Sequence, residues 1–136
     1  MTNNFVEIIP RLSILVRDKR NVIRTSFVFK HSTVKDPNWK QMVLYIGRDI
    51  TDSLNLHMGD RVQFSYNPND LYIWSLKKSK DKSGFKLNGS VGGASLKIQI
   101  TWVLFDIKAE DRFVKTVKHE VIDEEIMIYA DIYKGA

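Results

Sequence analysis

The sequence predicts a mostly β protein that folds as a single domain, a β barrel or meander with one short helix. Three observations lead to this prediction. The 136 residues are enough to bury one hydrophobic core without disulfides or metal. Most apolar segments alternate with polar residues at every second position, which is the period of a strand. A helical period, with apolar residues four positions apart, occurs only over residues 48–56.

The first part of the chain predicts strands separated by turns. Residues 5–9 and 12–16 are apolar runs, and Pro10 separates them. Residues 17–21 are charged and predict a turn that leads into residues 22–29, which are rich in β-branched and aromatic types. We expect 12–16 and 22–29 to form a hairpin, and residues 36–38, Asp-Pro-Asn, to form a turn after it.

The clearest order of elements begins at residue 42. Residues 42–46 predict a strand that ends at Gly47. Ile50 and Leu54 then share one face of a short helix, and Gly59 suits the exit turn because glycine accepts positive φ angles.

The next two strands form a predicted hairpin. Residues 61–66 and 71–76 both alternate, and the turn sequence Asn-Pro-Asn-Asp separates them. The four lysines within residues 77–82 then predict a solvent-exposed turn.

The last third of the chain is also β in pattern. Residues 84–87 predict a short strand, and the three glycines within 88–95 predict a flexible connection. Residues 96–102 alternate, which directs Leu96, Ile98, Ile100 and Trp102 inward and leaves Lys97, Gln99 and Thr101 outward. In residues 117–132 we expect the core-facing side chains to be Val121, Ile126, Ile128 and Ala130.

One set of residues carries a family resemblance. It comprises a strand, a short helix with a Leu-Asn-Leu ending, a Gly-Asp-x-Val strand start and a hairpin that closes on lysines. The positions are Ile46, Asp49-Ile50, Leu54-Asn55-Leu56, Gly59-Asp60-Arg61-Val62, 71–76 and Lys77-Lys78. This pattern resembles the SpoVT/AbrB-like family, small DNA-binding and antitoxin domains built as dimeric swapped-hairpin barrels. The chain departs from the family at Gly47, where a Pro is usual, and at 31–41, where the family has a tight hairpin.

The resemblance implies a function and an assembly. It implies a swapped-hairpin-like core over residues 42–79, a homodimer, binding to double-stranded DNA and a regulatory, non-enzymatic role. In that family the DNA contacts come largely from arginines on the strand and hinge around the hairpin. The positions that correspond here are Arg24 and Arg48.

The charge distribution adds further candidates. Residues 1–100 hold 16 Lys and Arg against 8 Asp and Glu, whereas residues 101–136 hold 5 against 8. A basic body can neutralise phosphates, although ordinary solvent-exposed charge gives the same count. The candidate DNA-binding residues are Arg24, Arg48, Arg17, Lys19, Arg20 and Arg61.

The acidic segment 106–136 predicts a C-terminal β extension of the single domain 1–136, able to contact a protein partner. The alternative function is therefore a protein-interaction or structural β domain, such as an accessory protein of a phage or mobile element, or an antitoxin-like partner-binding protein.

The residues give no support for catalysis. The chain has no cysteine, and its three histidines lie far apart in the sequence. The consecutive acids 123–125 would alternate between the two faces of a strand, and the glycines of 88–93 lack the Gly-Lys-Ser/Thr ending of a phosphate loop. We expect no enzyme activity, no metal and no cofactor. We also expect a cytoplasmic protein that does not enter membranes, since no signal-peptide pattern or membrane-length apolar run occurs.

Overall fold

The computed structural model describes residues 19–29, 40–90, 92–101, 109–110 and 112–134. The strands within them are, in chain order, β1 (Ile23–Val28), β2 (Gln41–Gly47), β3 (Arg61–Asn67), β4 (Asp70–Lys78), β5 (Phe85–Lys86), β6 (Asn88–Gly89), β7 (Ser95–Ile100), β8 (Lys115–Ile122) and β9 (Glu125–Tyr129). They are joined by a short α-helix, α2 (Arg48–Ser53), and a 3-10 turn, η1 (Asp131–Tyr133). The predicted strands 5–9 and 12–16 and the turn 36–38 lie outside the described residues.

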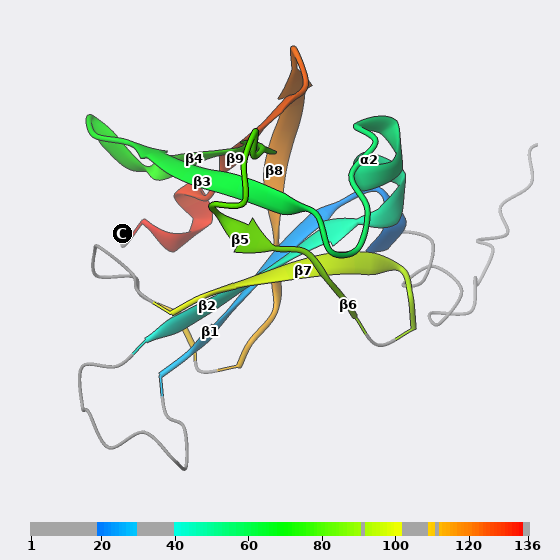
Figure 1. Cartoon of the computed structure of the whole chain (residues 1–136). Helices are drawn as coiled ribbons and strands as arrows, with labels where there is room; N and C mark the ends of the chain where they lie inside the picture. The colour runs from blue at the N-terminus through cyan, green and yellow to red at the C-terminus, as the bar shows by residue number, and fades with distance from the viewer. Residues whose placement is uncertain (1–18, 30–39, 91, 102–108, 111, 135–136) are drawn as a thin grey trace, which may run out of the picture.

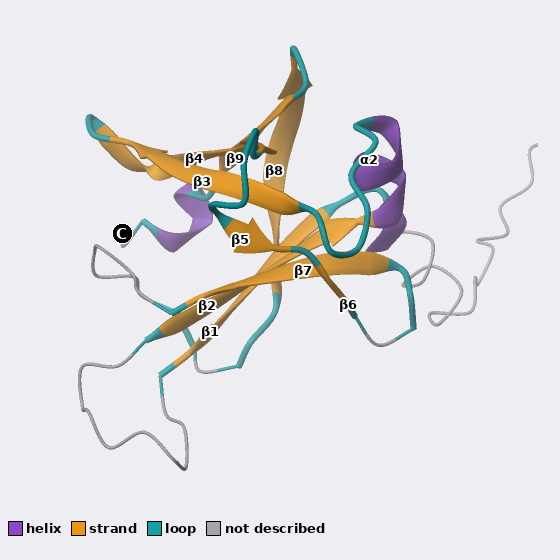
Figure 2. Cartoon of the chain, viewed as in Figure 1, coloured by secondary structure: helices purple, strands orange, loops and turns teal. Residues whose placement is uncertain are grey.

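The described strands form one antiparallel sheet that is nearly closed into a barrel (Figures 1 and 2). Their order across the sheet is β5-β3-β4-β9-β8-β1-β2-β7-β6. Several neighbours are consecutive in the chain, such as β1 with β2, β3 with β4 and β8 with β9. The prediction of a mostly β barrel with one short helix is therefore confirmed.

The order of elements predicted from residue 42 onward is present as β2, α2, β3 and β4. The glycine between β2 and α2 is required by its surroundings. The Gly47 N–H donates to the Val22 carbonyl at 2.9 Å, a bond that proline cannot make. A Cβ atom at this position would lie 2.2 Å from the Arg20 carbonyl oxygen. These contacts leave no room for a side chain at position 47.

Leu87 joins the two edges of the sheet. β5 pairs with β3 at one edge, β6 pairs with β7 at the other, and Leu87 is the residue between them. Leu87 is fully buried; its N–H donates to the Asp60 carbonyl and its carbonyl accepts from the Gly59 N–H, both at 2.8 Å. The connection predicted to be flexible from residue 88 therefore begins with a paired strand, because Asn88 and Gly89 pair with β7.

The C-terminal strands lie in the middle of the sheet. β9 pairs with β4 and β8 pairs with β1, so the β8–β9 hairpin connects the two halves of the barrel. After β9, the side chain of Tyr133 in η1 is buried, and its ring packs edge-on against Phe27 with centroids 5.0 Å apart. The two strands of the acidic segment, β8 and β9, are thus part of the barrel wall.

The core consists of the inward side chains that the alternation predicts. Leu96, Ile98, Ile126, Ile128 and Ala130 are all buried. Further buried members come from the strands, from α2 and the segment after it, and from η1: Ile23, Phe27, Met42, Leu44, Ile46, Ile50, Leu56, Val62, Trp74, Leu76, Ile100, Val117 and Tyr133.

One residue assigned to the core is placed differently. Val121 pairs with buried Ile126 but is 45% exposed, because the end of the β8–β9 hairpin projects beyond the barrel (Figure 1). Its inward-facing register is correct, but the barrel does not extend far enough to cover it. Trp102, also expected to face inward, lies outside the described residues.

Candidate nucleic-acid interface

Five outward-facing side chains form a line across neighbouring strands, which we call the outward row. Strand pairing places Thr116 beside Arg24, Arg24 beside Tyr45, Tyr45 beside Lys97 and Lys97 beside Asn88. The side chains before and after each of the three central members point into the core, so the row faces outward. Strands lie about 4.8 Å apart, so the row spans about 19 Å from β8 to β6.

Arg24 is the best-defined cation of the row. Its guanidinium lies over the Tyr45 ring, 4.9 Å from the centroid, and its Nη2 donates to Ser95 Oγ at 3.3 Å. The Nε atom is buried and has no hydrogen-bond partner among the described residues. Burial lowers the pKa of Arg24 from its ordinary value, but a guanidinium remains charged at neutral pH. The stacked guanidinium is thus held in place, and most of its donors are not engaged.

Arg48 lies at the same end of the sheet. It follows Gly47, which pairs with Ser95, and its backbone N–H donates to the Ala94 carbonyl at 2.9 Å. Arg24 and Arg48 are therefore both attached to the start of β7. Among the described residues, no carboxylate forms an ion pair with Arg24, Arg48 or Lys97.

Four of the five strands that carry the row contain no acidic residue. β1, β2, β6 and β7 together hold no Asp or Glu, while Arg24 and Lys97 are their two cations. The fifth strand, β8, carries Glu120 four residues beyond Thr116. The next outward pair along the strands, Ser26 with Val43, is buried, while Gln99 on β7 beside Val43 is exposed. Arg24 and Lys97 therefore give the β1, β2, β7 and β6 part of this face positive charge without a carboxylate on the same four strands.

The remaining predicted DNA-binding residues are placed differently. Arg20 Nε lies 3.0 Å from Asp49 Oδ1, and its Nη2 lies 3.9 Å from Asp52, so its charge is offset by α2. Lys19 precedes it, and both have helical backbone geometry in place of the predicted turn. Arg61 begins β3, where its guanidinium donates to the Gly84 carbonyl at 3.0 Å. Arg17 lies outside the described residues.

Four members of the outward row, Thr116, Tyr45, Lys97 and Asn88, were missed as site residues. The alternation directs Lys97 outward, and Tyr45 lies between inward-facing Leu44 and Ile46, so their facing was readable from the sequence. The residues beside them on adjacent strands could not be predicted, because alternation does not reveal that β2 lies between β1 and β7.

The histidines of the described part do not form a reactive group. His57 is exposed, and its Nε2 lies 2.8 Å from Asn55 Oδ1. His119 pairs with Ile128 on the inward side of β8, where burial lowers its pKa. Within the described ranges, no three His, Asp or Glu side chains are arranged to hold a metal ion.

Comparison with protein-family models, with curated proteins and with solved structures found no match for this chain. Among the described residues, no helix has both the length and the apolar character needed to cross a membrane.

Proposed function

We propose that this chain binds DNA through the outward row together with Arg48, and that it acts as a regulator without enzymatic activity. The observation that carries the proposal is the pair of cations Arg24 and Lys97 on four strands that contain no acid, with the backbone of Arg48 bound to the start of β7 beside them. Each can contact one phosphate, and Tyr45 holds the guanidinium of Arg24 in place before DNA arrives.

The order β2, α2, β3, β4 supports the proposed relation to the SpoVT/AbrB-like family, and Arg24 and Arg48 are the positions which that relation selects.

The test is a gel-shift series with a mixed-sequence duplex at low salt. Arg24→Gln, Arg48→Ala and Lys97→Ala should each weaken binding by on the order of tenfold, because a hydrogen bond to a charged group contributes about 1.5–3 kcal/mol. Arg24→Gln keeps part of the stem that packs on Tyr45. Lys82→Ala is the matched control, since it removes one positive charge from an exposed turn. If the control weakens binding as much as the other three, the named residues do not form the interface.

A second candidate function is a protein-interaction domain. It is favoured by the β8–β9 hairpin, whose projecting end exposes Val121 and Ile122 beside the acids Asp123 and Glu124. A pull-down with the intact protein and with Ile122→Ser would test it. A partner retained equally by both forms would argue against this surface.

A further inference from the structure

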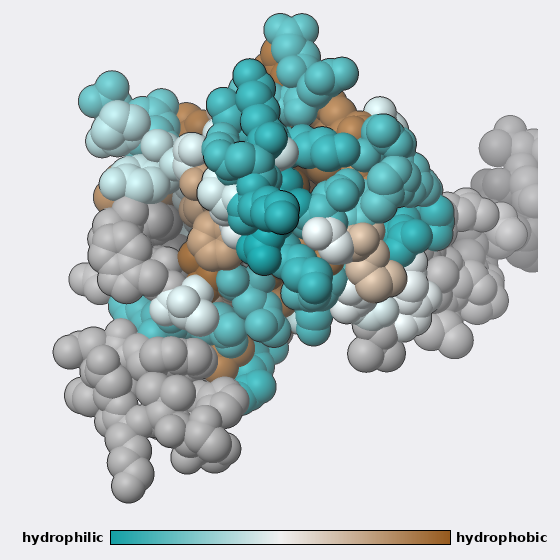
Figure 3. Space-filling view, in the orientation of Figure 1, coloured by the Kyte–Doolittle hydropathy of each residue, from teal (hydrophilic) through white to brown (hydrophobic). Residues whose placement is uncertain are grey.

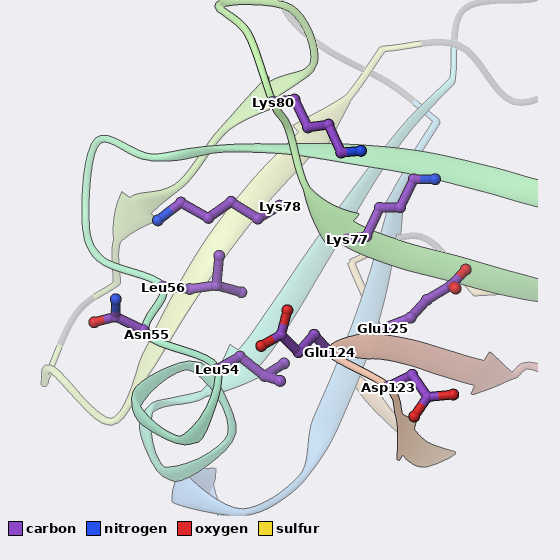
Figure 4. Close-up of a pocket in the computed structure, with 9 residues that line it drawn as sticks. All are labelled: Leu54, Asn55, Leu56, Lys77, Lys78, Lys80, Asp123, Glu124 and Glu125. Atoms are coloured by element: carbon purple, nitrogen blue, oxygen red, sulfur yellow. The ribbon is translucent and has the colours of Figure 1, made fainter.

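A cleft with walls of opposite charge lies beside the end of the β8–β9 hairpin, and we call it the charged cleft (Figure 4). Its volume is about 460 Å³. Lysines from the end of β4 and just beyond it form one wall, acids from the β8–β9 turn form the other, and the segment after α2 forms the floor. The lining residues are Lys77, Lys78 and Lys80; Asp123, Glu124 and Glu125; and Leu54, Asn55 and Leu56.

The two walls are not paired with each other. Among the described residues, the ion pair of the lysine wall joins Lys78 Nζ to Asp60 at 3.7 Å, away from the acids. Lys77 and Glu125 are opposite each other in the β4–β9 register without an ion pair between them. Glu124 extends over the floor beside Leu54 and Leu56 (Figure 4). Both signs of charge therefore remain free for an external partner.

The hairpin that carries the acidic wall projects from the barrel (Figure 1). Near its end Val121 is 45% exposed and Ile122 is 48% exposed. Hydrophobic surface is visible beside the polar tip of this hairpin (Figure 3). A projection with apolar side chains thus lies next to a hollow whose floor combines Leu54 and Leu56 with the polar Asn55.

We propose that the charged cleft and the hairpin end form a two-fold interface between two copies of this chain. In such an interface one surface patch meets an identical patch, so the patch must complement itself. Rotation by a two-fold axis places the lysine wall of each copy against the acidic wall of the other. A partner of one charge sign would satisfy one wall and repel the other, so the cleft favours a second copy over a uniformly basic or acidic partner.

The interface also complements in shape. The projecting hairpin end of each copy enters the hollow of the other, which covers Val121 and Ile122. No strand exchange is involved, because each copy keeps its own nearly closed sheet. The outward row lies on β8, β1, β2, β7 and β6, so the interface and the proposed DNA-binding face use different residues.

The test is sedimentation equilibrium of the full chain without nucleic acid, with two charge-reversed variants. Lys77→Glu/Lys80→Glu makes both walls acidic, and Asp123→Lys/Glu124→Lys makes both walls basic. Each should raise the dimer dissociation constant at least tenfold, and an equimolar mixture should form a heterodimer, because reversed walls then face each other with opposite charge. Lys82→Glu, a reversal in the same exposed turn but outside the cleft, should dimerise as the wild type does.

Circular dichroism checks that both variants fold, which we expect because the four exchanged positions, Lys77, Lys80, Asp123 and Glu124, are all exposed. A wild type that is monomeric throughout the micromolar range overturns the proposal. So does a wild-type dimer that both reversals leave intact, since its interface then lies elsewhere. Neither result bears on DNA binding by the outward row.

Discussion

The buried hydroxyl pair of Thr25 and Tyr133 provides a test of how the C-terminal turn is held. The Tyr133 hydroxyl bonds Thr25 Oγ1 and also lies 3.4 Å from the Thr25 carbonyl oxygen, and both residues are at most 1% exposed. Tyr133→Phe leaves the Thr25 hydroxyl without this partner, so it should cost about 1–3 kcal/mol of unfolding free energy. Thr25→Val should lower the unfolding free energy by less than that, because the Tyr133 hydroxyl can still donate its hydrogen bond to the carbonyl oxygen of residue 25.

The double variant Thr25→Val/Tyr133→Phe measures the interaction energy between the two hydroxyl groups. Once one hydroxyl is lost, removal of the other leaves no buried polar group behind, so the two changes should couple by about 1 kcal/mol in a double-mutant cycle. Urea unfolding at neutral pH measures all four proteins. Tyr129→Phe is the matched control, since its hydroxyl bonds Glu120 at the exposed surface and should matter little. Strict additivity of the two buried changes would refute the reasoning.

Two further predictions concern Gly47 and His119. Gly47→Ala should destabilise the fold by about 1–3 kcal/mol, because its Cβ would lie 2.2 Å from the Arg20 carbonyl oxygen. Gly92 has a positive φ and open space around it, so Gly92→Ala should lower the unfolding free energy by only about 1 kcal/mol, measured by urea unfolding. An equal loss of unfolding free energy in both variants would contradict the close contact between position 47 and Arg20. His119 has a pKa lowered by burial, so the unfolded chain takes up a proton first as the pH falls below 6.5. Stability should be constant above that pH and decline between it and the lower folded pKa, and His119→Gln should remove this decline. If His119→Gln shows the same decline in stability with falling pH as the wild type, His119 does not cause that decline.

The sequence predicts which side of the sheet most strand residues face, but it does not predict which strands pair with one another. Leu96, Ile98 and Ile100 alternate with polar residues, and the structure buries all three. The same pattern in residues 117–132 does not reveal that β8 and β9 lie between β4 and β1. Alternation reports which side of a sheet a residue faces, whereas strand order depends on contacts between distant segments.

The candidate site shows the same division. Arg24 and Arg48 were identified from a local resemblance, and the structure places both beside the start of β7. Arg20 was grouped with them on charge alone, and its pairing with Asp49 could not be read from residues 29 positions apart. The contact of Tyr45 with the Arg24 guanidinium depends on the register between β1 and β2, which the sequence does not reveal.

The salt dependence of DNA binding tests the proposed function most directly. If Arg24, Arg48 and Lys97 each contact one phosphate, the slope of log affinity against log salt for wild type should be about −2.7, at roughly −0.9 per contact. Each substitution at these positions should reduce the magnitude of the slope by about one, and Lys82→Ala should leave it unchanged. Absence of binding to duplex DNA even at low salt, or a slope that none of the three substitutions alters, would contradict DNA binding by this face.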